Sequence, residues 1–315
     1  GSVSATVYVQ IPSTTSSGSP SGNITCESVH PLEGNSTTAS ATVAASGTVT
    51  DAPNAGTLSG TEDVCSDGST TFSSDGDSGA WSSGSTSVAT IDASTGVVTP
   101  VSAGSSVMTY TVTGTGGCSD ATATRTATVT TAPNAGTLSG TEAVCSDGST
   151  TFSSDGDAGA WSSGSTGVAT IDASTGAVTA VAAGSSLMTY TVTGTGGCSD
   201  ATATRTATVT TAPDAGTLSG TEALCSGSTT DFDTDGDSGG TWSSADDNVA
   251  TINSSTGLVT AVAAGSSLMT YTVTGTGGCS DATATRTATV GVAPTITTAT
   301  DLTTVANTCG VTELS

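Results

Sequence analysis

Apolar and polar residues alternate over short segments of this chain, and clusters of Gly, Pro, Asp and Asn separate the segments. Residues 107–112 read Val-Met-Thr-Tyr-Thr-Val, and residues 121–129 place Ala, Arg and Val on one face and Thr on the other. Alternation with a period of two is typical of strands with one buried face, and Thr and Val favour strands. The pattern predicts an all-β chain with about seven short strands in every 80 residues, as in a β-sandwich.

The alternation also predicts which side chains form the core. We expect Trp81, Ile91, Val98, Tyr110 and Val112 to be buried, together with their equivalents further along the chain. The Thr face of the last strand should be exposed. This core is small, and an 80-residue domain with few large apolar side chains needs additional covalent support.

The chain is built from internal repeats, which the phrase Ala-Pro-Asn/Asp-Ala-Gly-Thr-Leu-Ser-Gly-Thr-Glu marks three times. We expect five segments. They are an incomplete N-terminal β segment at 1–51, full repeats at 52–131, 132–211 and 212–292, and an incomplete C-terminal β segment at 293–315.

Each full repeat contains two cysteines, 53 or 54 positions apart. Fixed positions of this kind indicate disulfides and an oxidising compartment, and the repeats have no His that would suggest a metal site. We expect each repeat to hold its own bridge, which would add about 3–4 kcal/mol in the chain-entropy model. The predicted pairs are Cys65 with Cys118, Cys145 with Cys198, and Cys225 with Cys279.

A further pattern begins at Trp81-Ser-Ser and continues through Val88-Ala-Thr-Ile-Asp and Ser94-Thr-Gly-Val-Val-Thr to Val101-Ser-Ala-Gly. The pattern recurs from Trp161 and from Trp242. It resembles the group 2 bacterial immunoglobulin-like domain, and the resemblance covers all three repeats. It implies tandem immunoglobulin-like sandwiches of the kind that act as spacers in adhesins, surface-layer proteins and fibres. Such domains share an architecture rather than one function.

The two incomplete segments complement each other. Residues 1–51 resemble the last two strands of a repeat and contain Cys26, whereas residues 293–315 resemble the first two strands and contain Cys309. Three arrangements fit. Copies could join head to tail by strand addition with a Cys26–Cys309 bridge between subunits, which makes a non-closing polymer. The chain could be a window of a longer protein, or the ends could pair within one chain.

The charge of the chain restricts its partners. It has 27 acidic residues and only three basic ones, all Arg, so its formal net charge is −24. Nucleic-acid affinity depends on Lys and Arg at phosphates, so we expect no nucleic-acid partner. No segment has the roughly 18 consecutive apolar residues of a membrane span, so we expect no membrane insertion.

Several side chains are candidate sites. Asp233, Asp235 and Asp237 alternate in a turn and could hold Ca²⁺, the one cofactor that we consider, although such turns also form for backbone reasons. One Arg in each repeat is expected to form a structural ion pair. The possible Glu partners are Glu62, Glu142 and Glu222.

Covalent glycans are a further expected partner class. Asn23, Asn35 and Asn253 fit the N-glycan acceptor pattern, which this Ser- and Thr-rich composition makes frequent. Thr14 and Thr15 lie in a Ser/Thr/Gly/Pro stretch that suits O-glycosylation.

We expect no catalytic residues, because nothing arranges the single His30 or a carboxylate pair in a pocket. The sequence predicts a secreted or cell-surface structural subunit that polymerises with itself. An adhesin whose repeats bind carbohydrate or a protein is the alternative, and an exposed aromatic patch would favour it. A third possibility is an accessory region of a secreted enzyme.

Overall fold

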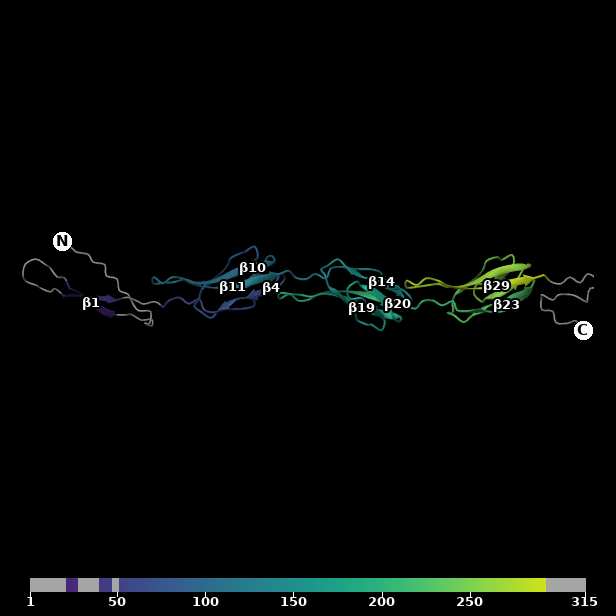
Figure 1. Cartoon of the computed structure of the whole chain (residues 1–315), viewed down its shortest axis with the longest axis horizontal. Coiled ribbons are helices and arrows are strands. Elements are labelled where there is room, and N and C mark those ends of the chain that lie inside the picture. The colour runs from purple at the N-terminus through teal and green to yellow at the C-terminus, as the bar shows by residue number, and fades with distance from the viewer. Residues whose placement is uncertain (1–20, 28–39, 47–50, 293–315) are drawn as a thin grey trace, which may run out of the picture. The chain divides into compact units, whose positions relative to one another are not determined.

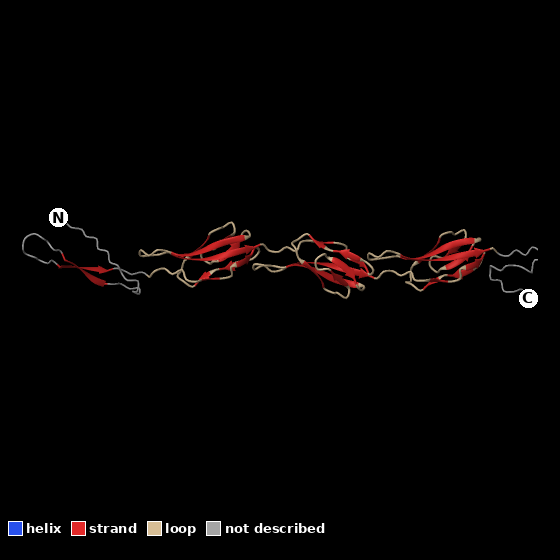
Figure 2. Cartoon of the chain, in the orientation of Figure 1, coloured by secondary structure: helices blue, strands red, loops and turns tan. Residues whose placement is uncertain are grey.

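The computed structural model describes residues 21–27, 40–46 and 51–292 of the chain. Every regular element in these ranges is a strand and none is a helix (Figures 1 and 2). The part of the chain that the structure describes accordingly has no helix that could cross a membrane. The all-β prediction is confirmed, and three repeated sets of sheets form three tandem immunoglobulin-like sandwiches.

Two strands precede the first full repeat. They are β1 (Ser21–Glu27) and β2 (Ser40–Ser46), which pair antiparallel with Ile24 opposite Val43. The second of them falls in the segment that the sequence assigns to the last strand of a repeat.

The first full repeat contains nine strands, two more than expected. They are β3 (Leu58–Ser59), β4 (Asp63–Cys65), β5 (Thr70–Thr71), β6 (Ser73–Ser74), β7 (Ala80–Ser83), β8 (Ala89–Ile91), β9 (Val97–Pro100), β10 (Gly104–Val112) and β11 (Ala121–Thr130).

The second and third repeats contain the same nine strands in the same order. The second has β12 (Leu138–Ser139), β13 (Ala143–Cys145), β14 (Ser149–Thr151), β15 (Ser153–Ser154), β16 (Ala160–Ser163), β17 (Ala169–Ile171), β18 (Ala177–Ala180), β19 (Gly184–Val192) and β20 (Ala201–Thr210). The third has β21 (Leu218–Ser219), β22 (Ala223–Cys225), β23 (Thr229–Asp231), β24 (Asp233–Thr234), β25 (Thr241–Ser244), β26 (Ala250–Ile252), β27 (Leu258–Ala261), β28 (Gly265–Val273) and β29 (Ala282–Gly291).

Two principal sheets form each sandwich. In the first repeat, one sheet has the order β4-β11-β10-β7, the other has the order β5-β9-β8, and β3 pairs separately with β6. Strands β10 and β11 form a hairpin from Gly104 opposite Val129 to Val112 opposite Ala121. The short strand β4 runs parallel to the end of β11, with Cys65 opposite Thr130. This parallel pairing places the first cysteine of the repeat at the end of the last strand.

The core lies between the two sheets, where apolar residues of both meet. Met108 and Ala127 of the larger sheet pack in one cluster with Ala89 and Val98 of the smaller one, and all four are fully buried. The rings of Trp81, Phe72 and Tyr110 lie beside them, with the Trp81 and Tyr110 centroids 4.9 Å apart. Such tilted contacts add modestly to the burial of the rings themselves.

The predicted core is mostly confirmed. Trp81, Val98, Tyr110 and Val112 are buried, whereas Ile91 is only partly buried and packs against the cluster. The Thr face of β11 is exposed only over its first half. Toward its end the Thr residues are half-buried, because β4 pairs alongside that part of the strand.

The compact units of the molecule do not coincide with the repeats. One unit holds the described residues up to Pro133 together with Thr193–Asp200, a loop of the second repeat. The other unit holds Asn134–Val192 and the described residues after Ala201. A loop of the second repeat therefore belongs structurally with the first repeat, because this loop carries Cys198, which is bonded to Cys65.

Candidate functional site: the disulfide junctions

The disulfides join consecutive repeats rather than closing single ones. Cys65 of the first repeat is bonded to Cys198 of the second, and Cys145 of the second is bonded to Cys279 of the third. The predicted pairing within each repeat is wrong. The bridges connect positions 133 and 134 residues apart instead of 53 or 54, so the first cysteine of one repeat pairs with the second cysteine of the next.

Strand pairing fixes one half of the first junction. Cys65 ends β4, and the chain continues along β11 because the Ser66 amide donates to the Thr130 carbonyl at 2.8 Å. The Ser66 hydroxyl then accepts a hydrogen bond from the Ala132 amide at 2.9 Å, in the segment that leads to the next repeat. The cysteine is thus held at the end of the sheet from which the next repeat begins.

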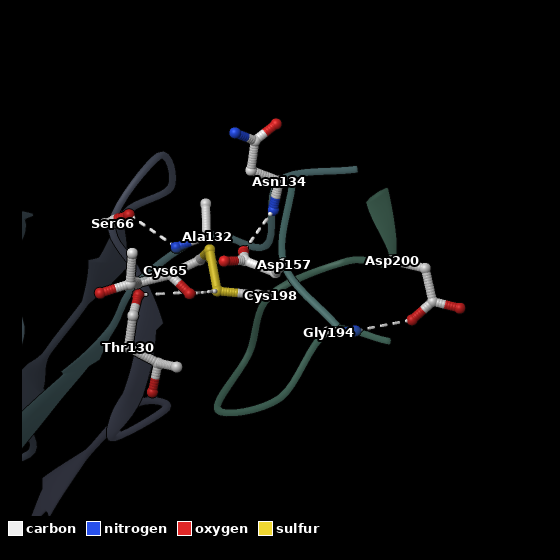
Figure 3. Close-up of a disulfide and its surroundings, with 10 residues drawn as sticks. Cys65, Ser66, Thr130, Ala132, Asn134, Asp157, Gly194, Cys198 and Asp200 are labelled. Carbon is white, nitrogen blue, oxygen red and sulfur yellow. Dashed lines mark hydrogen bonds between the residues drawn. A yellow bond between two sulfur atoms is a disulfide. The ribbon is translucent and has the colours of Figure 1, made fainter. Parts of the chain in front are cut away.

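A short Gly-rich loop supplies the other half (Figure 3). In the loop Thr193–Asp200, the Gly194 amide donates to Asp200 Oδ1 at 2.8 Å and the Cys198 amide donates to the Thr195 carbonyl at 3.1 Å. These bonds fold the loop on itself, with Gly196 and Gly197 at the centre of the turn and Cys198 directly after them. The Cys198 sulfur lies 3.6 Å from the carbonyl oxygens of Thr130 and Thr131, a close contact but no hydrogen bond, since a bridged sulfur has no proton to donate.

Two glycines let this loop approach the preceding repeat. Gly196 and Gly197 have φ values of 56° and 82°, in the left-handed region that glycine adopts without strain. A Cβ on Gly196 would collide with the Thr130 side chain, and one on Gly197 would lie 2.8 Å from the Asp63 carbonyl oxygen. The loop therefore packs directly against the end of the preceding sheet.

The second junction repeats the first. The Gly275 amide donates to Asp281 Oδ1 at 2.8 Å, and a Cβ on Gly277 would collide with Thr210, the equivalent of Thr130. The two Cα atoms of the bridge are 4.7 Å apart in both junctions. The arrangement is thus a property of the repeat.

Four cysteines take no part in these two bridges: Cys118 in the first repeat, Cys225 in the third repeat, and Cys26 and Cys309 in the terminal segments. Cys118, at the second cysteine position of the first repeat, is half-buried and carries a free thiol. Cys225, at the first position of the third repeat, is disulfide-bonded. Cys26 lies on β1, for which only the backbone is described, and Cys309 lies outside the described residues. Their predicted pairing stays a prediction.

The arginines anchor the beginning of each repeat to its last strand. Arg125 lies 3.7 Å from Glu62, and the equivalent pairs in the other repeats measure 3.7 and 3.5 Å, so the predicted ion pairs are confirmed. The guanidinium also donates to the carbonyl oxygens of Leu58 and Gly60 and lies over the Phe72 ring. These contacts are internal to the repeat, and they give the side chain a structural role.

The acidic turns use their carboxylates to hold the backbone. In the third repeat, Asp235 Oδ1 accepts a hydrogen bond from the Thr217 amide and Asp237 Oδ2 accepts one from the Asp214 amide. The Asp233 carboxylate instead accepts from the amide of Thr234. Among the described residues, no three His, Cys, Asp or Glu side chains converge as a metal site would require. The calcium prediction has no support from this geometry.

The carboxylate of Asp92 is exposed to solvent, but four donors of its own turn bind it. Asp92 Oδ1 accepts from the amides and hydroxyls of both Ser94 and Thr95, at 2.8–3.0 Å. The Thr95 amide, followed by the other three donors, lowers the pKa of Asp92 far below its usual range. Asp172 has the same donors and the same shift, with the Ser174 hydroxyl as the largest cause. The third repeat has Asn253 here, which keeps only the two backbone bonds.

The candidate glycosylation sites divide by position. Asn253 is exposed in the turn just described. Asn23 lies on β1, and Asn35, Thr14 and Thr15 lie outside the described residues. None of these sites is tested by the structure.

Sequence reasoning missed the loop that receives the bridge. The sequence does contain a signal for this loop, because the segment Thr-Gly-Thr-Gly-Gly-Cys-Ser-Asp occurs unchanged at residues 113–120, 193–200 and 274–281. A plain hairpin turn does not need two adjacent glycines and a capping Asp around a cysteine.

Comparisons with known proteins give distant similarities. No protein-family model and no curated protein matches the sequence. Among solved structures, domains 1–6 of the surface layer protein SbsC match at 14% identity and TM-score 0.23, covering 81% of this chain and 43% of that one. A C-terminal fragment of intimin, in complex with the intimin-binding domain of its receptor, matches at 16% identity and TM-score 0.29, covering 60% and 59%.

A third match is a SusE-like surface-located polysaccharide-binding protein from Bacteroides thetaiotaomicron, at 12% identity and TM-score 0.22, covering 75% of this chain and 72% of that one. The chain spans less than half the length of the SbsC fragment. At such low identities and TM-scores the similarities concern the sandwich fold alone. The chain is a protein of tandem immunoglobulin-like domains whose consecutive repeats are joined by disulfides.

Proposed function

We propose that the chain is a structural subunit of a bacterial extracellular filament or surface stalk, and that its repeats are spacers without catalytic activity. Copies join head to tail, so that residues 1–51 of one copy, which resemble the last strands of a repeat, complete the fold that residues 293–315 of the preceding copy, which resemble the first strands, begin. The observation that carries this proposal is the pair of disulfides between consecutive repeats.

A disulfide between two repeats restrains their motion relative to each other, which a disulfide within one repeat does not do. Each neighbouring pair is connected by the polypeptide and again by a disulfide, so two covalent connections restrain their relative motion where a linker alone would leave a hinge. Such reinforcement suits a protein that transmits force or keeps a distance. Disulfides also persist in oxidising surroundings, which supports a secreted or cell-surface location.

The acidic composition supports the same role. A formal charge of −24 on 315 residues keeps copies apart sideways by repulsion, so that association is directed to the chain ends. The adhesin alternative predicts an exposed aromatic patch, and the Trp residues do not form one. Trp81, Trp161 and Trp242 are all buried, and none contributes to an exposed aromatic patch.

The test is the assembly state of the full chain produced in an oxidising compartment. We expect fibres by negative-stain electron microscopy, and on non-reducing gels a ladder that falls on reduction to a chain near 29.7 kDa plus any glycan. A variant that ends at residue 292 should keep its folded repeats and form no fibres. If the full chain remains a monomer without fibres under both conditions, the filament proposal is wrong.

A further inference from the structure

The two junction bridges lie outside the cores of the sandwiches. Each of the three apolar clusters consists of residues of a single repeat, and none of these clusters contains a cysteine. Both bridges connect different repeats, so neither closes a loop within one sandwich. Each sandwich is therefore held by its own sheets and core, and the bridges restrain the motion between sandwiches.

The loop that receives a bridge keeps its conformation without one. The equivalent loop of the first repeat, residues 113–120, is not bridged, because its cysteine carries a free thiol. The Gly114 amide still donates to Asp120 Oδ1 at 2.8 Å, as in both bridged loops. Gly116 and Gly117 have φ values of 63° and 91°, close to the 56° and 82° of the bridged loop in the second repeat. Opening a bridge should therefore leave the loop folded.

Solvent reaches one cysteine of each bridge more easily than the other. Cys65 and Cys145 are buried at the ends of their strands, whereas Cys198 and Cys279 are half-buried in the loops. Thiol–disulfide exchange depends on access to the sulfur that is attacked. A reductant should therefore attack the loop cysteine and release the buried one.

The fold also keeps wrong partners apart after a bridge opens. Cys65 lies opposite Thr130 at the end of β11, whereas Cys118 precedes the first residue of that strand. The ten residues of β11 span about 30 Å, and the Cα atoms of bonded cysteines lie within about 7 Å of each other. Cys145 and Cys198 have the same arrangement around β20. A folded repeat therefore cannot close its own cysteine pair.

We propose that the junction disulfides are a redox-controlled restraint on the motion between repeats. A dithiol reductant opens them and an oxidant closes them, while the three sandwiches stay folded. In the open state the polypeptide and the polar contacts of the loop alone join the repeats, because no apolar cluster among the described residues includes two repeats. Domains joined by small polar contacts move relative to each other. The inference concerns a single chain and does not depend on filament formation.

Reduction proceeds in two exchange steps. A thiolate of the dithiol attacks the Cys198 sulfur and releases the Cys65 thiolate. The second thiolate of the same reductant then attacks the reductant sulfur of this mixed disulfide, which forms the disulfide of the reductant and releases the Cys198 thiolate. The dithiol loses two electrons and two protons in total, and the two cysteines gain them. Oxidation by a small-molecule disulfide reverses the change and reduces that disulfide to two thiols.

Polar contacts keep the opened partners close to each other. The Ser66 hydroxyl accepts a hydrogen bond from the Ala132 amide at 2.9 Å, and the Ser146 hydroxyl accepts one from the Ala212 amide at 2.8 Å. These bonds hold the start of a repeat beside the first cysteine of the repeat before it. The local concentration of the two thiols therefore stays high, and the original bond should reform.

Reduction of the full chain by dithiothreitol without denaturant tests the proposal. We expect the four junction cysteines to become alkylated in all molecules while Trp emission stays unchanged, since each sandwich buries one Trp. Small-angle X-ray scattering should show a broader distribution of intramolecular distances in the reduced chain. Bridges that resist reduction until denaturant is added, the Trp emission of an unfolded chain, or superimposable scattering curves would each overturn the proposal.

Peptide mapping after reoxidation tests the pairing. Cleavage on the amino side of Asp places the junction cysteines on separate peptides, which are residues 63–66, 120–146, 172–199 and 247–280. Reoxidation of the folded chain with oxidised glutathione should return these peptides to the two original pairs. Reoxidation in guanidinium chloride should add pairs within repeats, such as 63–66 with 92–119. Pairs within repeats in the folded sample would show that the fold does not select the partner, and the proposal would be wrong.

Two variants separate the junction bridges from the other cysteines. C65S/C145S/C198S/C279S lacks both bridges and should scatter, without reductant, like the reduced wild-type chain, with unchanged Trp emission. C118S keeps both bridges, so it should match the oxidised wild-type chain and respond to dithiothreitol in the same way. A fourfold variant that does not fold, or that scatters like the oxidised wild-type chain, contradicts the proposed restraint.

Discussion

Arg125, Arg205 and Arg286 are the only arginines in the protein, which has no lysine, and each joins three parts of its repeat. Each donates to two backbone carbonyl oxygens near the start of the repeat, lies about 5.5 Å over a buried Phe ring, and reaches a Glu carboxylate. The guanidinium is about one quarter exposed, whereas the Glu is about half exposed. The carbonyl bonds should therefore matter more than the ion pair, because solvent screens exposed pairs strongly.

We predict that replacing all three arginines by Met lowers the free energy of unfolding by about 1–2 kcal/mol per repeat, because two backbone carbonyl oxygens, one of them in a part-buried hydrogen bond, lose a charged donor. Replacing Glu62, Glu142 and Glu222 by Gln should cost under about 1 kcal/mol per repeat. Urea unfolding followed by Trp fluorescence measures both, since each repeat has one Trp. Equal losses in the two variants would assign the stabilisation to the ion pair instead.

The turn carboxylates predict a response to acid. Hydrogen bonds lower the pKa of Asp92 and Asp172 in the folded protein, so the folded state binds a proton more weakly than the unfolded state. The resulting stabilisation is complete above the usual Asp pKa of 3.8 and is lost as the pH falls from there toward the lowered value. Asn253 cannot contribute in this way.

The double variant D92N/D172N should therefore melt at a lower temperature than the wild-type protein at pH 7, with a difference that shrinks on acidification below pH 4. The reverse change, N253D, should add acid sensitivity to the third repeat. Thermal melts by circular dichroism at several pH values measure these differences. A melting difference independent of pH would show that the charge of these turns contributes nothing.

At the scale of single elements, the loop Thr193–Asp200 is the part that sequence reasoning interpreted least well. Strand alternation predicted the sandwich because burial of one face leaves a period of two in the sequence. It placed Trp81, Val98, Tyr110 and Val112 correctly. Phe72 and Met108 were missed. Phe72 lies between the two-residue strands β5 and β6, where no alternation can be recognised, whereas Met108 shares a face of β10 with Tyr110 and Val112 and could have been found from the alternation.

The pairing of the cysteines could not be derived from the sequence. Identical repeats space their cysteines identically, so a bridge within a repeat and a bridge to the next repeat leave the same pattern. The deciding fact is three-dimensional. Strand β4 runs parallel to the end of β11, which places Cys65 beside the next repeat and away from the loop that carries Cys118.

We predict that G196A weakens the first junction, because the added methyl group would collide with Thr130 and the residue would keep a left-handed φ of 56°. Alkylation of Cys65 and Cys198, read by mass spectrometry, should rise from none to a substantial fraction of molecules. Gly167→Ala is the matched control in the same repeat, since its Cβ would meet nothing within 4 Å. Complete bridging in G196A would show that the loop can dock by another route.

At the scale of the whole molecule, the disulfides change how the chain can be extended. Without them, a force on the ends could unfold and stretch every residue from 51 to 292. With them, the shortest covalent path passes from Cys65 to Cys198, back along the chain to Cys145, and across to Cys279. Residues outside this path stay in loops that the bridges shield from load.

This disulfide topology predicts that removal of the bridges greatly increases the extension measured by single-molecule stretching. The load path of the bridged protein contains residues 51–65, 145–198 and 279–292, about a third of the residues from 51 to 292, at about 3.3–3.6 Å each when extended. The variant C198S/C279S removes both bridges and should extend about threefold further over this range, whereas C118S should behave as the wild-type chain. Similar extensions of bridged and unbridged proteins would show that the junctions carry no load, and the spacer would then depend on the sandwiches alone.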